Sequence, residues 1–215
     1  MKNFFLILLI ITFIYSCDSN RSSNKKIPDL DKQKAIENFI KQGDVSYNNH
    51  DFVKASEYYN KAIKIDSKND IAIYKAAQAY AQEFKTKKAI KLLSKAIKLN
   101  PKNPDYYFFK GKVLILDKKF NEAINNFNKV LEINPNFIEA LLQKAYCYYF
   151  QFNYDKSLEI IELIINQTNS FAEVFYLKGL VNLDLEKKEQ ACKDFHKAQD
   201  LGYEVEQFLI VQACN

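Results

Sequence analysis

Glycine, proline, arginine and histidine are scarce in this sequence, and tryptophan is absent. The 215 residues include four Gly, four Pro, two His and four Cys, and Arg21 is the one arginine among 31 basic residues. So few turn residues argue against a β-sandwich and against glycine-rich phosphate loops. Proteins that read nucleic acids usually rely on Arg, so its near absence argues against that class.

Apolar residues, by contrast, are numerous enough to form an extensive core. Hydrophobic residues make up 48% of the chain and charged residues 27%, with 17 Phe and 14 Tyr. The formal net charge is +5, and we expect most Lys side chains to cover solvated helix faces. His50 and His196 lie in different units and we expect no cysteine beside either, and no Ser/His/Asp set or paired-carboxylate motif is present. We therefore predict no catalytic residues, no cofactor, no metal site, no small-molecule substrate and no nucleic-acid partner.

The N-terminus has the features of a secretion signal. Lys2 precedes an apolar run over residues 4–15, which is shorter than the roughly 20 residues that a membrane-spanning helix needs. The run ends at Ser16-Cys17 and resembles a bacterial lipoprotein signal, which implies cleavage after residue 16 and acylation (palmitate) of Cys17. An ordinary signal peptide with an unrelated Cys and an uncleaved anchor are the alternatives. Residues 17–31, which contain Pro28, are predicted to form a flexible tether.

A repeat of 34 residues runs through the rest of the chain. Small residues recur in two series, Ala55, Ala89, Ala123, Ser157, Ala191 and Gly43, Ala77, Gly111, Ala145, Gly179. Two further series at the same spacing are mainly apolar, Tyr59, Leu93, Phe127, Ile161, Phe195 and Ala62, Ala96, Val130, Ile164, Ala198. Four series in one register indicate a structural repeat.

The repeat is typical of a pair of packed helices. Small residues allow two helix backbones to approach closely, and the larger residue of the Tyr59 series fills the space between them. Pro101 and Pro135 follow predicted second helices, where Pro ends a helix, and Asn103-Pro104 is an N-cap followed by Pro at the first helical position.

This pattern resembles the tetratricopeptide repeat (TPR). The resemblance implies an all-α, right-handed α-solenoid of five units over residues 36–69, 70–103, 104–137, 138–171 and 172–205, within a folded part that spans residues 32–205. A capping helix over residues 203–215 would cover the last unit, giving eleven helices in all.

In this family the first helix of each unit lines a concave groove. Carried over to this chain, the resemblance implies a partner-binding groove that contains Tyr47, Tyr74, Phe108, Ile115, Leu142, Tyr146, Tyr149 and Tyr176. The expected partner is a protein, bound as a helix or an extended peptide. The alternatives are that these residues are core, or that the chain's own tether or cap covers them. Some members of the family hold the C-terminal carboxylate of a partner with a clamp of Lys, Asn and Arg side chains. That clamp is not expected here, because Ile40 and Asp44 occupy the fifth and ninth positions of the first unit, and neither an aliphatic side chain nor an acid can hold a carboxylate.

Cys192 and Cys214 flank the turn predicted at Gly202 at similar distances. In an antiparallel helix pair they would come close, so a disulfide that attaches the cap helix is possible in an oxidising compartment, with buried free thiols as the alternative.

Together these features predict a non-catalytic TPR scaffold in the bacterial cell envelope. A lipid anchor would hold it at a membrane, facing the periplasm or the cell surface. A self-associating structural lipoprotein and a cell-envelope enzyme with an unrecognised site are the alternatives.

Overall fold

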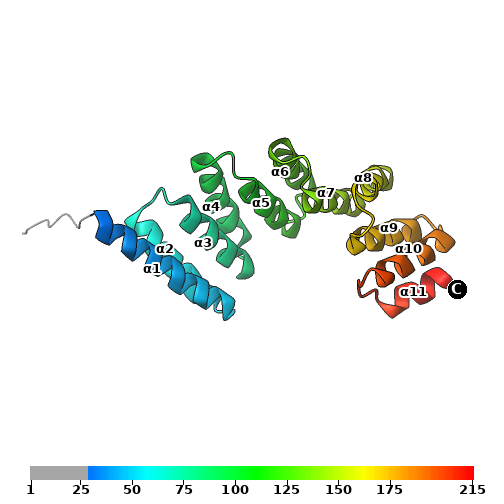
Figure 1. Cartoon of the computed structure of the whole chain (residues 1–215), viewed down its shortest axis with the longest axis horizontal. Helices are drawn as coiled ribbons and strands as arrows, with labels where there is room; N and C mark the ends of the chain where they lie inside the picture. Colours follow the sequence, from blue (N-terminus) through cyan, green and yellow to red (C-terminus); the bar gives the residue numbers. More distant parts are fainter. Residues whose placement is uncertain (1–28) are drawn as a thin grey trace, which may run out of the picture.

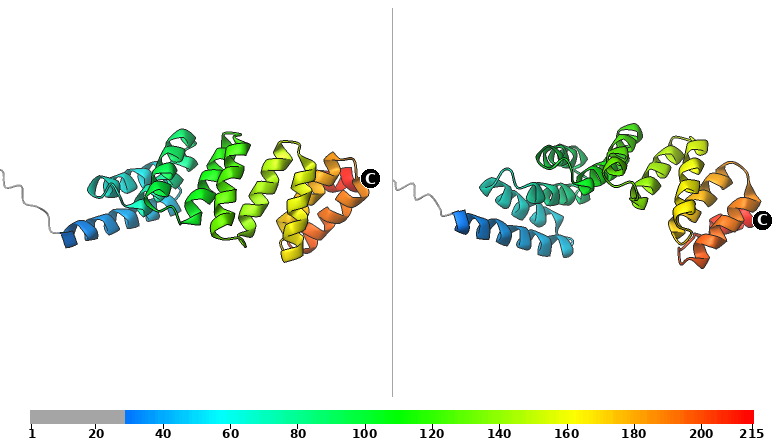
Figure 2. Two further views of the ribbon diagram at one scale, coloured as in Figure 1. Left: turned by 90° about the horizontal axis from the view of Figure 1, so that it is seen from above. Right: turned by 45° about the horizontal axis from the view of Figure 1, so that its top comes forward.

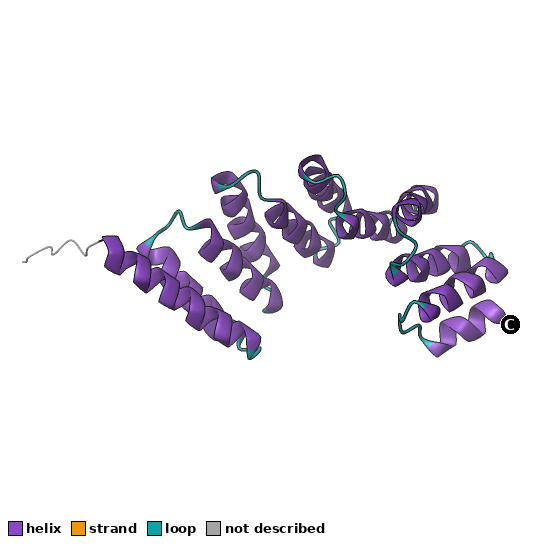
Figure 3. Ribbon diagram, viewed as in Figure 1, coloured by secondary structure: helices purple, strands orange, loops and turns teal. Residues whose placement is uncertain are grey.

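The computed structural model describes residues 29–215, which form eleven helices and no strands (Figure 3). The signal segment 1–16, Cys17 and residues 18–28 of the predicted tether lie outside the described residues. The helices are α1 (Asp29–Asn48), α2 (Phe52–Ile65), α3 (Asp70–Gln82), α4 (Thr86–Leu99), α5 (Pro104–Leu116), α6 (Phe120–Ile133), α7 (Ile138–Phe150), α8 (Tyr154–Gln167), α9 (Ala172–Asp184), α10 (Lys188–Asp200) and α11 (Gln207–Cys214).

Local capping explains where several helices begin. The Asn69 side chain accepts a hydrogen bond from the Ala72 backbone N–H at 2.8 Å, and Asn103 accepts one from Asp105 at 2.9 Å, directly before α3 and α5. These bonds satisfy backbone donors that have no partner inside the helix. The helices α7 and α9 have no side-chain cap, so their starts depend on packing.

The repeat series form the core, as the spacing predicts. Every member of the Ala55, Tyr59 and Ala62 series is at most 2% exposed, because each lies between the two helices of its own unit and the next unit. Ser157 is the polar member, and its hydroxyl donates to the Ala145 carbonyl at 3.0 Å, which removes the cost of burying it.

The helix pairs stack side by side into an elongated arch (Figure 1), and the further views in Figure 2 show the same order. Each helix contacts the next along the chain, and the first helices α3, α5, α7 and α9 also contact one another in succession. In Figure 1, α4, α6 and α8 lie along the upper, outer side of the arch. The first helices therefore form its inner side. The predicted all-α solenoid with a C-terminal cap is confirmed.

The two ends of the solenoid differ from the predicted boundaries. The helix α1 begins at Asp29, inside the predicted tether, with Asp29 and Asp31 in its first turn, where acidic side chains are favourable. The cap is shorter than residues 203–215, because Gly202 has a φ of +87° and ends α10, and α11 begins only after Glu206. Within residues 29–215 no helix combines the length and apolar character needed to cross a bilayer.

Candidate functional site

The inner face is the surface of the first helices on which the predicted groove residues lie. Seven of the eight are half-buried: Tyr47, Tyr74, Phe108, Ile115, Tyr146, Tyr149 and Tyr176. The six aromatic ones lie close to neighbouring aromatic rings, and Ile115 packs against the core of α5, α6 and α7. Leu142 is the exception, because it is 1% exposed and packs in the core formed by α7, α8 and α9. Its prediction as a surface residue was wrong, since the following unit covers it.

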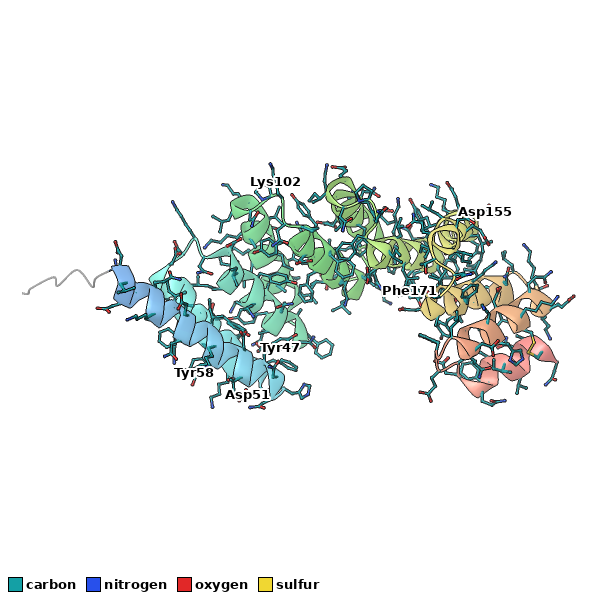
Figure 4. The ribbon with its side chains drawn as sticks, viewed as in Figure 1. Tyr47, Asp51, Tyr58, Lys102, Asp155 and Phe171 are labelled. Atoms are coloured by element: carbon teal, nitrogen blue, oxygen red, sulfur yellow. A yellow bond between two sulfur atoms is a disulfide. The ribbon has the colours of Figure 1, made fainter. Side chains whose placement is uncertain are left out.

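In Figure 4, Lys102 and Asp155 mark the outer side of the arch and Phe171 marks the start of α9.

The aromatic side chains of the inner face pack against one another along the solenoid. The Tyr74 ring lies 4.9 Å from the Tyr106 ring, and the Tyr176 ring lies 4.7 Å from the Tyr203 ring, between centroids. The Tyr149 ring lies 6.0 Å from that of Tyr154. Aromatic rings at these separations are in favourable packing contact, so the inner face presents a closely packed apolar surface.

Carboxylates accompany the tyrosines of the fourth and fifth units. The Tyr176 hydroxyl donates to Glu206 at 3.2 Å, and the Tyr154 hydroxyl donates to Asp184 at 3.2 Å. Tyr146 lies beside Glu173, and burial followed by that negative charge raises the Tyr146 pKa. Burial and Glu206 likewise raise the pKa of Tyr176 to about 12. These phenols therefore stay protonated near neutral pH and act as hydrogen-bond donors.

Glu173, Asp184 and Glu206 have no ion pair within residues 29–215. At the other end of the inner face, Asp44 is neutralised by Lys75 at 2.7 Å. Among residues 29–215, three carboxylates without an ion pair therefore lie beside the tyrosines of the last two units, and Asp105, beside Tyr74, also has none. We call Tyr146, Tyr176, Glu173 and Glu206, with Tyr203, the acidic tyrosine cluster.

Only part of this cluster could be predicted from the repeat. Tyr146 and Tyr176 were predicted as groove residues but Glu173 was not, although it holds the second position of its unit, which in this family also faces the groove. Tyr203 and Glu206 lie in the connection from α10 to α11. Their place beside α9 follows from the path of that connection, which no repeat position predicts.

A disulfide attaches the cap. The Sγ atoms of Cys192 in α10 and Cys214 in α11 are bonded, with their Cα atoms 5.1 Å apart. Cys147 is the buried free cysteine of the described residues, and burial raises the pKa of its thiol to about 12. That thiol is therefore protonated and unreactive at neutral pH.

His196 lies beside the disulfide, which corrects the expectation that no cysteine is near it. Its Nε2 atom is 3.7 Å from the Sγ atom of Cys214. The reason is that α11 folds back over α10, so residues 18 positions apart meet. One signal in the sequence was available, because Cys192 and His196 are four residues apart and share a helix face.

The comparisons with known proteins agree with the geometry of the helix pairs. Three family models match: one described as "Anaphase-promoting complex, cyclosome, subunit 3" over residues 48–130, and two described as "Tetratricopeptide repeat" over residues 114–181 and 172–201. No curated protein matches the sequence.

Solved structures of similar fold cover most of the chain. YrrB, described as a TPR protein with an unusual peptide-binding site, is 25% identical, with a TM-score of 0.65 over 85% of this chain and 97% of that one. MamA (41-end) from Desulfovibrio magneticus RS-1 is 19% identical, with a TM-score of 0.71 over 80% of this chain and 95% of that one. The pilF protein of Pseudomonas aeruginosa is 15% identical, with a TM-score of 0.70 over 81% of this chain and 80% of that one. Tetratricopeptide-repeat models thus match residues 114–201, and the helix pairs of 34-residue period give the described part of the chain the fold of a TPR solenoid.

Proposed function

We propose that this protein is a non-catalytic scaffold that binds a protein partner along its inner face. The acidic tyrosine cluster is the observation that carries the proposal. It combines a packed apolar surface with hydrogen-bond donors and with carboxylates that form no ion pair within residues 29–215. The peptide-binding site named in the description of YrrB supports the same use of the fold.

The charge of the cluster selects the kind of partner. Glu173 and Glu206 flank the rings of Tyr176 and Tyr203, so a Lys or Arg side chain placed there would gain both ion pairing and cation–π contact. We propose that the partner is an extended or helical segment in which apolar residues alternate with at least one basic residue.

Crosslinking in cells tests the binding face. A photoreactive residue in place of Tyr149 on α7 should capture one dominant protein, whereas the same residue in place of Leu163, which is 46% exposed on α8, should not. Equal capture from both positions would contradict binding at the inner face. A product that contains two copies of this chain would instead support a self-associating structural lipoprotein.

Charge removal tests the kind of partner. The double variant Glu173→Gln/Glu206→Gln should weaken binding of the captured segment by about tenfold or more, and added salt should weaken wild-type binding more than binding by the variant. The double variant Glu57→Gln/Glu159→Gln removes the same charge from exposed residues of α2 and α8 and is the matched control. No difference between the two double variants would refute the basic partner while leaving the crosslinking result intact.

We further propose that Cys17 carries lipid and tethers the scaffold to a membrane of the bacterial cell envelope, which the signal-like N-terminal sequence supports. Cys17→Ser should move the protein from the membrane fraction to the soluble fraction of cells. Cys214→Ser, in which another cysteine is lost, should leave it with the membranes. Retention of the Cys17→Ser variant would refute the lipid anchor.

A further inference from the structure

Three side chains with metal-binding atoms converge where the cap meets the last unit. Cys192 and His196 lie one turn apart on α10, and Cys214 ends α11. Their Sγ and ring nitrogen atoms all lie within 4.8 Å of one another. Thiolates and an imidazole are the ligands that zinc prefers in proteins.

We propose that reduction of the Cys192–Cys214 disulfide converts this cluster into a zinc site with Cys192, His196 and Cys214 as ligands. The inference does not depend on the proposed partner. It rests on the distances, on the orientation of His196, and on the access that the surface provides.

The distances fit a tetrahedral site after small side-chain rotations. With Zn–S of about 2.3 Å and Zn–N of about 2.0–2.1 Å, a sulfur and a nitrogen ligand lie about 3.6 Å apart. The Cys214 Sγ and His196 Nε2 atoms are already 3.7 Å apart. In the same geometry two sulfur ligands lie about 3.8 Å apart, so the two sulfurs must separate once their bond is broken. Cys214 is exposed near the end of α11 and has room to turn.

A hydrogen bond orients the imidazole for this role. The other ring nitrogen, Nδ1, lies 3.2 Å from Oε1 of Gln199, one turn further along α10. In the tautomer in which Nδ1 donates to that carbonyl oxygen, the Nε2 lone pair faces the sulfurs. Metal-binding histidines are commonly oriented through their second nitrogen in this way.

The site is open to solvent. A surface hollow of about 320 Å³ lies against both cysteines and is also lined by Lys188 and Ala213. A metal ion can therefore enter without unfolding of the cap, and water can occupy the fourth coordination position, as in zinc sites with three protein ligands.

The redox step is balanced by an external dithiol. It transfers two electrons and two protons to the Cys192–Cys214 bond, which breaks into two thiols while the dithiol becomes a disulfide. Zinc then displaces the two thiol protons and binds the thiolates. Oxidising conditions would attach α11 by a covalent bond, and reducing conditions with zinc would attach it through the metal.

Metal titration of the full chain tests the proposal. A Cys17→Ser background removes the cysteine that lies outside the described residues, and a phosphine reductant avoids adding a competing thiol. The reduced protein should bind one equivalent of Zn²⁺, and Co²⁺ in its place should give a thiolate-to-cobalt absorption band. The oxidised protein should do neither. Absence of zinc binding by the reduced protein would overturn the proposal.

Variants identify the ligands. His196→Ala, at an exposed position, should weaken zinc binding by well over tenfold, and Gln199→Ala should weaken it by about tenfold through loss of orientation. Glu204→Ala, another exposed change near the cap, is the matched control and should have no effect. Unchanged affinity in His196→Ala, with one equivalent still bound, would assign the zinc to a different site and refute this one.

Discussion

The backbone of Gly111 lies directly against the ring of Phe127. A Cβ atom at position 111 would come within 2.5 Å of the Cε1 atom of that ring, closer than any real contact. The same relationship joins Gly43 to Tyr59 and Gly179 to Phe195. In the second and fourth units, where the small residue is Ala, the facing residues are Leu93 and Ile161. Each unit therefore has one of two pairings, either a glycine against an aromatic ring or an alanine against an aliphatic side chain.

Gly111→Ala should lower the free energy of unfolding by about 1–2 kcal/mol, because overpacking against Phe127 exceeds the gain in helix propensity. The double variant Gly111→Ala/Phe127→Leu reproduces the pairing of the second unit. Chemical denaturation of both single variants and the double variant measures their coupling. The double variant should lose less free energy of unfolding than the two single variants lose together. Losses that add exactly would contradict a match in size between positions 111 and 127.

Phe152→Gly should raise the free energy of unfolding by about 0.5–1 kcal/mol. Phe152 has a φ of 58° in the turn between α7 and α8, a conformation that glycine adopts without the steric cost of a Cβ atom. The ring is 77% exposed, so its removal costs little packing. Phe152→Ala is the matched control, since it removes the ring and keeps the Cβ atom. Equal stabilisation in both variants would assign the effect to the ring instead of the backbone.

Tyr74→Phe should make stability less sensitive to alkaline pH. Burial, followed by the charge of Asp105, raises the Tyr74 pKa to about 12, above the ordinary value of 10.0. The unfolded chain therefore loses this proton at lower pH than the folded chain, and the stabilisation is complete below pH 10 and lost as pH rises toward 12. Denaturation midpoints between pH 9 and 12 should fall more steeply for wild type than for Tyr74→Phe. Tyr58→Phe, on a half-buried tyrosine of α2, is the comparison variant.

Cys214→Ser should destabilise the cap by up to about 3 kcal/mol, because the lost bond closes a loop between residues 22 positions apart. Hydrogen exchange of the α11 amides should accelerate, while exchange in α3 should stay unchanged. In zinc-free buffer a reductant should accelerate α11 exchange in wild type and have no further effect on the variant. Slow α11 exchange in the variant would mean that Leu209 and Ala213, both buried, hold the cap without the bond.

Much of the fold could be predicted because the signals that define it are local. Asp70, Pro104, Ile138 and Ala172 were predicted as the first residues of their units, and each begins a helix. Capping side chains, proline and apolar periodicity act within a few residues, so they can be identified without knowledge of the surrounding fold.

The candidate sites could be predicted only in part. Leu142 has the position of a surface residue in its repeat but is buried, because exposure depends on how closely the next unit packs. Glu206 and Tyr203 reach Tyr176 through a connection outside the repeat, and His196 meets Cys214 through the fold-back of α11. Contacts of this kind depend on angles between units, and small differences in side-chain volume set those angles.

The sequence alone determined the helix pairs, their register and the residues that fill them, since a 34-residue period with glycine or alanine facing a large side chain permits one way of packing each pair. The tertiary structure decided what the solenoid presents to other molecules. Among residues 29–215 it left the carboxylates of Glu173 and Glu206 without an ion pair beside the inner tyrosines, and it placed His196 at the cap disulfide. Both outcomes depend on the distance and direction between side chains on different helices, and these are defined only once the units have packed.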